Sequence, residues 1–167
     1  MTETQIILQN RNNVLVKRSS KGYGLTYFTK KDFKKGDVVM FGLGKIINHQ
    51  TSHISVQIAY KKHYLPTKWT GKYWNHSCDP NTYVKSRSDR FPNLIALQNI
   101  KKGEEINYGY WMTEFAWIKN ADELRVRCKC GTKKCKGRIL SYSNLTKRDQ
   151  DKLKKNKYCS KYLYAQL

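Results

Sequence analysis

The chain has 167 residues, 39% of them hydrophobic, which suffices for the core of one domain but not for a transmembrane helix. Its net charge of +21 comes from 33 Lys and Arg residues against 12 Asp and Glu. This balance disfavours a basic partner and favours a polyanion such as nucleic acid; a solvated lysine-rich surface from biased composition explains it equally well. The N-terminal stretch MTETQIILQNRNN lacks the order of a signal peptide, so we expect a soluble intracellular protein that does not enter a membrane.

The first 110 residues predict short strands joined by glycine turns. Residues 14–29 alternate apolar and polar side chains around Gly22-Tyr23-Gly24, which predicts two strands and a tight turn. Residues 53–65 alternate again, with Ile54, Val56 and Ile58 on one face. The remaining strand signals are a hairpin pair at 81–86 and 93–100 and a turn followed by a short strand at 101–110.

Helical signals are few. Residues 113–126 are long enough for a turn or two of helix, and residues 145–163 are the best helix candidate. In that segment Thr146 would be the N-cap, with Asp149 at the third helical position. Many short strands with few helices predict a mainly β protein with little α-helix and a C-terminal helix.

The chain contains five cysteines and lacks a secretion signal, which argues against a disulfide framework. Cys128, Cys130 and Cys135 form a C-x-C-x4-C pattern, and such closely spaced thiolates suit tetrahedral Zn²⁺. The fourth ligand would be Cys78, Cys159, a His or a water. Cys78 lies two residues from His76, so the residues themselves also allow a catalytic Cys–His pair.

Four stretches decide between these readings: KGYGL at 21–25, YWNHSCDPN at 73–81, GEEINYGY at 103–110 and CKCGTKKCKGRIL at 128–140. In this order they resemble the SET-domain protein lysine methyltransferases that carry a post-SET zinc module, in a minimal single-domain form. The resemblance implies a SET domain at 12–112, a post-SET zinc module at 121–140 and a basic, helical tail at 141–167. It also implies several short β-sheets with a knot-like substructure that brings 75–78 and 104–110 side by side.

The resemblance assigns roles to individual residues. Tyr110 would be the catalytic tyrosine, and Cys78 would complete the zinc site with Cys128, Cys130 and Cys135, leaving Cys159 as a bystander. The channel for the substrate lysine would be lined by Tyr73, Tyr108 and Trp111. S-adenosylmethionine would contact Lys21, Gly22, Tyr23, Gly24, Asn75, His76, Tyr110 and Leu140. Three positions depart from the family pattern: Lys72 replaces Arg, Asn107 replaces Thr, and Gly109 replaces Asp.

The implied function is methyl transfer from S-adenosylmethionine to a lysine amine of a protein such as a histone. An acidic groove would accept that lysine, and acidic residues near the site in sequence are Glu104, Glu105, Glu114, Asp122 and Glu123. Nucleic acid or a nucleosome would contact the basic tail. The protein would work in the nucleus or on the chromosome of a eukaryote, or in the host cell of a virus or bacterium. The alternative is an inactive SET-like zinc module that binds nucleic acid or chromatin; a cysteine hydrolase is disfavoured because nothing beyond His76 supports it.

Overall fold

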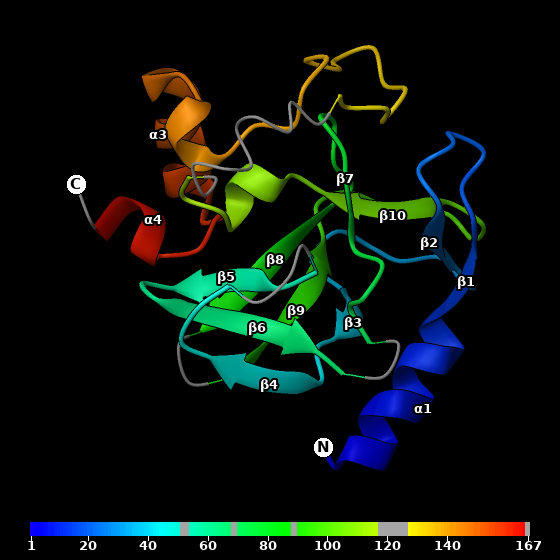
Figure 1. The fold of residues 1–167 in the computed structure, drawn as a ribbon. Helices are drawn as coiled ribbons and strands as arrows, with labels where there is room; N and C mark the ends of the chain where they lie inside the picture. The colour runs from blue at the N-terminus through cyan, green and yellow to red at the C-terminus, as the bar shows by residue number, and fades with distance from the viewer. Residues whose placement is uncertain (51–53, 68–69, 88–89, 117–126, 166–167) are drawn as a thin grey trace.

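The computed structural model describes residues 1–50, 54–67, 70–87, 90–116 and 127–165. Short strands dominate, which confirms the mainly β class (Figure 1). The strands are β1 (Val14–Arg18), β2 (Leu25–Thr29), β3 (Val38–Phe41), β4 (Gly44–Ile47), β5 (Val56–Ala59), β6 (Lys62–Pro66), β7 (Asn75–His76), β8 (Thr82–Arg87), β9 (Arg90–Ala96) and β10 (Glu105–Tyr108). The helices are α1 (Glu3–Asn13), η1 (Tyr110–Met112), η2 (Tyr142–Asn144), α3 (Lys147–Asn156) and α4 (Tyr162–Ala165).

The strands form three small sheets, in the orders β1-β2-β10-β7, β3-β9-β8 and β4-β6-β5. The predicted hairpins are present: β1 pairs antiparallel with β2, and β8 with β9. At the tip of the first hairpin, Gly22 and Gly24 have φ angles of 80° and 99°, a region that favours glycine. The largest fully buried side chains come from all three sheets, η2, α4 and a connecting segment: Tyr27, Tyr64, Tyr142, Met40, Leu94, Ile100, Ile106 and Leu163.

The two residues of β7 pair in parallel with β10, so that Asn75 lies opposite Asn107 and His76 opposite Tyr108. The backbone N–H of Ser77 continues this contact by donating to the Tyr108 carbonyl at 3.0 Å. The expected proximity of 75–78 and 104–110 is therefore confirmed. It places the Asn-His pair beside the tyrosines of β10 and η1.

The alternation over 53–65 is divided between two strands. β5 and β6 are antiparallel and meet at a turn in which Lys61 has a φ of 52°. Val56 and Ile58 are buried, as predicted from their shared face. The turn was not apparent in the sequence because it contains Tyr60 and Lys61 in place of glycine.

The N-terminal helix α1 was not predicted, because its buried residues are the polar Asn10 and Asn13 and its apolar residues follow no clear helical period. The sequence signal was a capping box, in which the Thr2 side chain accepts from the Gln5 N–H and the Gln5 side chain from the Thr2 N–H. Asn10 docks the helix on β3: its side chain donates to the Phe41 carbonyl and accepts from the Phe41 N–H, both at 2.8 Å.

The C-terminal segment has two parts. α3 begins as predicted, with the Thr146 side chain accepting from the Asp149 N–H, and it has no buried residue. The following residues return to the core: Cys159, Ser160 and Leu163 are buried, and the Ser160 N–H donates to the Met112 carbonyl at 2.8 Å. Residues 158–165 thus support η1. Residues 117–126, which make up most of the segment 113–126 predicted to contain a helical turn, lie outside the described residues.

None of the described helices has both the length and the apolar character needed to cross a bilayer. α1 and α3, the two longest, are 11 and 10 residues long.

Replacing Asn10 with Ala should lower the free energy of unfolding by about 1–3 kcal/mol, because it leaves a part-buried N–H and carbonyl of β3 without partners. Urea denaturation measures this change. Asn12→Ala is the matched control, since Asn12 lies in the same helix and is exposed. Equal losses of unfolding free energy in the two variants would show that the contacts of Asn10 with β3 do not stabilise the fold.

Candidate active site and thiol cluster

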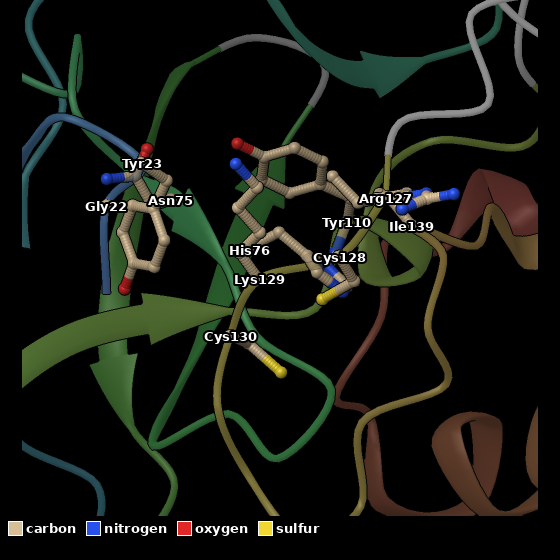
Figure 2. Close-up of a pocket in the computed structure, with 10 residues that line it drawn as sticks. All are labelled: Gly22, Tyr23, Asn75, His76, Tyr110, Arg127, Cys128, Lys129, Cys130 and Ile139. Atoms are coloured by element: carbon tan, nitrogen blue, oxygen red, sulfur yellow. Dashed lines mark hydrogen bonds between the residues drawn. The ribbon is translucent and has the colours of Figure 1, made fainter.

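A cavity of about 270 Å³ lies between the tip of the β1–β2 hairpin, β7, η1 and residues 127–139 (Figure 2). Its lining residues are Gly22, Tyr23, Asn75, His76, Tyr110, Arg127, Cys128, Lys129, Cys130 and Ile139. Five of the eight residues predicted to contact a cofactor are thus gathered around one space. Leu140 is buried in the core instead, and its neighbour Ile139 lines the cavity.

A partly buried carboxylate holds the hairpin tip. Glu105, on β10, accepts a hydrogen bond from the Tyr23 hydroxyl and forms an ion pair with Lys21 at 3.1 Å. The Ser19 N–H closes the turn by donating to the Gly24 carbonyl at 2.8 Å. Lys21 and Gly24 therefore shape the tip, although neither lines the cavity. Glu105 had been expected only as part of an acidic groove; its role here depends on a contact between residues 82 positions apart.

Asn75 and His76 are fixed by hydrogen bonds to neighbouring segments. The Asn75 side chain donates to the Leu25 carbonyl at 2.8 Å, which ties β7 to β2. Nδ1 of His76 accepts the backbone N–H of Tyr110 at 3.2 Å, and Nε2 lies 3.4 Å from Sγ of Cys78. Burial lowers the pKa of His76 to about 4, so the ring is neutral at neutral pH and its proton is on Nε2.

This arrangement argues against a Cys–His nucleophile. A base for Cys78 would need an unprotonated nitrogen facing the thiol, but the nitrogen that faces it carries the ring proton. His76 instead donates to the sulfur. Cys78 is also close to three other thiols, which a lone nucleophile does not require.

Tyr110 lies at the centre of the site. Its hydroxyl donates to the Trp74 carbonyl at 3.2 Å, and its ring is 5.2 Å from the His76 ring and 5.1 Å from the Tyr108 ring. Burial raises the pKa of Tyr110, so the phenol keeps its proton.

The three predicted channel residues do not line the cavity, but two of them adjoin it. Tyr108 packs on Tyr110, and Trp111 packs edge-on against His76 with 5.1 Å between ring centres. Tyr73 packs on Tyr27, with 5.8 Å between ring centres. A substrate channel lined by these three residues stays a prediction.

The departures from the family pattern have structural counterparts. A Cβ on Gly109 would overlap the Trp111 ring, so aspartate does not fit there. Asn107 exchanges hydrogen bonds with Asn81: the Asn107 N–H donates to the Asn81 side chain at 3.1 Å, and the Asn81 N–H donates to the Asn107 side chain at 3.4 Å. Lys72 is exposed and lies over the Tyr73 ring.

The four predicted metal ligands converge. The sulfur atoms of Cys78, Cys128, Cys130 and Cys135 all lie within 4.8 Å of one another, and those of Cys78 and Cys128 are 3.7 Å apart. A tetrahedral Zn²⁺ with bonds of about 2.3 Å needs sulfur atoms about 3.8 Å apart, so the cluster has the dimensions of such a site.

Backbone groups around the cluster suit thiolates. The Lys136 N–H donates to the Cys78 sulfur at 3.3 Å, and the Gly137 N–H to the Cys135 sulfur at 3.4 Å. Cys128 and Cys130 also line the cavity, so a metal bound there would set the shape of the cavity wall. Cys159 is buried elsewhere and does not belong to the cluster.

Comparison with known proteins identifies the domain. Residues 22–111, more than half of the chain, match the sequence model of the SET domain. The chain belongs to the SET domain family.

Relatives of this SET domain include much longer proteins. It is 28% identical over 145 residues to human histone-lysine N-methyltransferase 2D, a match that covers 75% of this chain and 2% of the relative. It is 26% identical over 152 residues to histone-lysine N-methyltransferase SUV39H2 of Xenopus tropicalis, covering 72% of this chain and 37% of that protein. The chain thus spans well under two thirds of the length of these relatives.

Among solved structures, the SET domain is similar to KRYPTONITE, whose crystal structure is a complex with mCHH DNA, an H3(1–15) peptide and SAH. The TM-score is 0.63 with 22% identity, over 78% of this chain and 30% of that one. This likeness establishes the fold.

Several site residues were not predicted from the sequence. Arg127, Lys129 and Ile139 line the cavity because residues 127–139 fold over it, and their proximity to the metal pattern was the only signal. Of the acidic residues expected near the site from the sequence, Glu114 is buried next to η1. Glu104 is in an exposed turn with Lys101, and Asp122 and Glu123 lie outside the described residues.

Proposed function

We propose that this SET domain is a protein lysine N-methyltransferase that uses S-adenosylmethionine. The observation that carries the proposal is the convergence of Gly22, Asn75, His76 and Tyr110 on one cavity, from three segments that are distant in sequence. The histone-lysine N-methyltransferase names of its relatives agree with this activity.

The cavity suits the cofactor in three ways. Gly22, with its positive φ, presents backbone without a side chain at the wall. Tyr23 and Tyr110 supply aromatic surface, and Arg127 and Lys129 supply positive charge for a carboxylate. When bound, S-adenosylmethionine supplies a methyl group on a sulfonium, which an amine can attack.

The residues of the chain would supply alignment and a dry environment. Tyr110 is held by His76 at its backbone and by Trp74 at its hydroxyl, so the phenol oxygen has a fixed position from which to orient an amine. Buried aromatic side chains of Tyr108 and Trp111 exclude water and favour an alkylammonium by cation–π attraction. The lysine must be neutral to react, and its ordinary pKa is about 10.4.

The thiol cluster would hold one Zn²⁺. Its four ligands come from two segments about 50 residues apart, so the metal would tie residues 128–140 to the N-H-S-C stretch and order the cavity wall. The inferred donor, Nε2 of His76, would stabilise the metal-bound sulfur of Cys78.

The proposed substrate is a lysine-containing segment of a protein, of the histone class named for the relatives. We also propose that nucleic acid or a nucleosome contacts the protein, which would place it at chromatin. α3 carries exposed basic residues, Lys147, Arg148, Lys152, Lys154 and Lys155, against two acidic ones. Because Cys159, Ser160 and Leu163 are buried, the exposed basic residues of this segment lie mainly on α3 and its flanks, with Lys161 beyond them. An inactive module that binds nucleic acid is the alternative; it would bind DNA without methylating protein.

Replacing Tyr110 with Phe should lower methylation by at least about 100-fold, because the amine loses the hydroxyl that orients it. The measurement is transfer of labelled methyl groups to histones and to a cell lysate. The melting temperature should change little, since one hydrogen bond to Trp74 is lost. Tyr83→Phe is the control, on β8 and away from the cavity. Wild-type turnover by Tyr110→Phe would refute the assignment.

Metal analysis of the purified chain should give one zinc per molecule. Cys78→Ser should lower that ratio and weaken cofactor binding measured by calorimetry, because the cavity wall loses its anchor. Cys159→Ser is the matched control and should keep the zinc. A ratio unaffected by Cys78→Ser would remove this residue from the site.

Binding to duplex DNA should weaken steeply with salt, because each phosphate contact adds about 0.9 to the slope of log affinity against log salt. Gln substitutions on α3 should reduce that slope by as much as about 3. The residues are Lys152, Lys154 and Lys155. Deletion of the whole tail would not be informative, since it removes core residues.

The control for this titration removes the same charge elsewhere, at three exposed lysines: Lys34, Lys35 and Lys102. Equal effects of the two triple variants would mean that total charge, and not α3, governs binding. Absence of binding at low salt would exclude the nucleic-acid contact.

A further inference from the structure

The carboxylate of Glu105 joins the tip of the β1–β2 hairpin, residues 19–24, to the body of the protein. Three side chains of the tip converge on it. The Tyr23 hydroxyl donates to Oε1, and the Lys21 ammonium forms an ion pair with Oε2 at 3.1 Å. The Ser19 hydroxyl donates to Oε2 at 3.5 Å. The Glu105 side chain is 10% exposed, so these contacts are largely shielded from water.

Glu105 itself has a fixed position in the first sheet. On β10 it pairs with Phe28 of β2, and its carbonyl accepts the side-chain N–H of Asn81 at 2.9 Å. Burial and the hydrogen bond to Glu105 raise the pKa of Tyr23, so the phenol keeps its proton and stays a donor at neutral pH. The tip is therefore bonded to an acceptor that the sheet holds in place.

The tip has few other attachments. Within the described residues, its remaining hydrogen bonds stay inside the tip. The Ser19 N–H donates to the Gly24 carbonyl at 2.8 Å, and the Gly22 N–H to the Ser19 carbonyl at 3.4 Å. The Lys21 N–H donates to the Ser19 hydroxyl at 3.2 Å. A Cβ on Gly22 or Gly24 would meet no other segment within 4 Å, so close packing does not hold these positions.

The tip also forms part of the wall of the cavity. Gly22 and Tyr23 line it together with residues of the 127–139 segment (Figure 2). Lys21 approaches that segment, since a Cβ on Gly131 would lie 3.8 Å from the Lys21 side chain. By holding Lys21 and Tyr23, the carboxylate fixes the hairpin wall relative to the segment that carries three of the four clustered thiols.

Building on the proposed function, we propose that Glu105 is a positioning residue that sets the affinity for S-adenosylmethionine by holding the hairpin tip in its binding position. Glu105 does not line the cavity, so it acts through Tyr23 and Lys21. A tip that is ordered before the cofactor arrives loses little conformational freedom on binding, and this lowers the cost of association. Turnover should depend less on Glu105, because Tyr110 is held by other residues.

The competing explanation is that Glu105 only stabilises the fold. β10 is an inner strand of the first sheet, whose order is β1-β2-β10-β7. Loss of its contacts would then lower the melting temperature and leave cofactor affinity as it was. Affinity, turnover and order of the tip are therefore measured separately.

Glu105→Ala should raise the Kd for S-adenosylmethionine about 10-fold in calorimetry, because the tip loses all three contacts. Its kcat at saturating cofactor should stay within about twofold of wild type, so the loss appears in the cofactor KM. Glu105→Gln should give a smaller rise in Kd, since the amide keeps an acceptor for Tyr23 but has no charge for Lys21.

Glu104→Gln is the matched control. Glu104 is the adjacent carboxylate, is exposed, and accepts only the Lys101 N–H within the described residues, so its loss should leave the cofactor Kd unchanged. An unchanged Kd in Glu105→Ala, or a fall in kcat without a rise in Kd, would overturn the proposal.

Tyr23→Phe tests the same contact from the tip and keeps the ring at the cavity wall. It should weaken cofactor binding, and adding it to Glu105→Ala should weaken binding no further, because both variants remove one interaction. Additive losses would show that the Tyr23 hydroxyl acts independently of Glu105. If Glu105→Ala does not fold, a wild-type Kd in Tyr23→Phe overturns the proposal.

A third measurement needs no cofactor. The Ser19 amide, which closes the tip, should exchange its hydrogen with solvent at least about 10-fold faster in Glu105→Ala than in wild type or Glu104→Gln, because the tip opens more often. Equal exchange in all three proteins contradicts the anchoring of the tip. If the wild-type chain does not bind S-adenosylmethionine although exchange responds as expected, the proposed function fails and the anchoring of the tip stands.

Discussion

β7 is only two residues long, and its parallel pairing with β10 determines the position of almost every group in the site. The pairing sets His76 opposite Tyr108 and delivers the chain into Cys78 on one side and into Tyr110 on the other. Parallel neighbours cannot be joined by a tight turn, so the intervening residues 77–104 form β8, β9 and their connections. The contact between β7 and β10 thus depends on β8 and β9 being in place.

His76 links the two halves of the site. Its ring accepts the Tyr110 N–H with one nitrogen and faces the Cys78 sulfur with the other. A shift of the thiol cluster would therefore act on the backbone of Tyr110 through a single rigid ring. This explains in physical terms why a structural metal and a reactive centre would share one short sequence: the Asn-His-Ser-Cys order puts both within reach of the same imidazole.

Features of the fold and the site could be predicted from the sequence where they depend on residues close together in the chain. The Gly22 turn, the Thr146 cap and the cysteine spacing are local patterns, and each was found where expected. The hydrogen bond between Glu105 and Tyr23 joins partners far apart in the chain. The helix α1 was not predicted because it packs on the core through the side-chain amides of Asn10 and Asn13 and has no apolar stripe.

The packing of Trp111 explains why the acidic group of this site lies where it does. Its ring occupies the space that a side chain at position 109 would need, so the aspartate usual between the two tyrosines is replaced by glycine. Glu105, the nearest acidic residue on β10, is engaged by Lys21 and Tyr23. The carboxyl whose charge acts on both Tyr108 and Tyr110 is Glu114. A substitution that made room at 109, such as Trp111→Leu together with Gly109→Asp, would put two carboxyl groups near one pair of phenols. Their mutual repulsion would raise the pKa of Glu114 further, so the residue would be protonated at neutral pH.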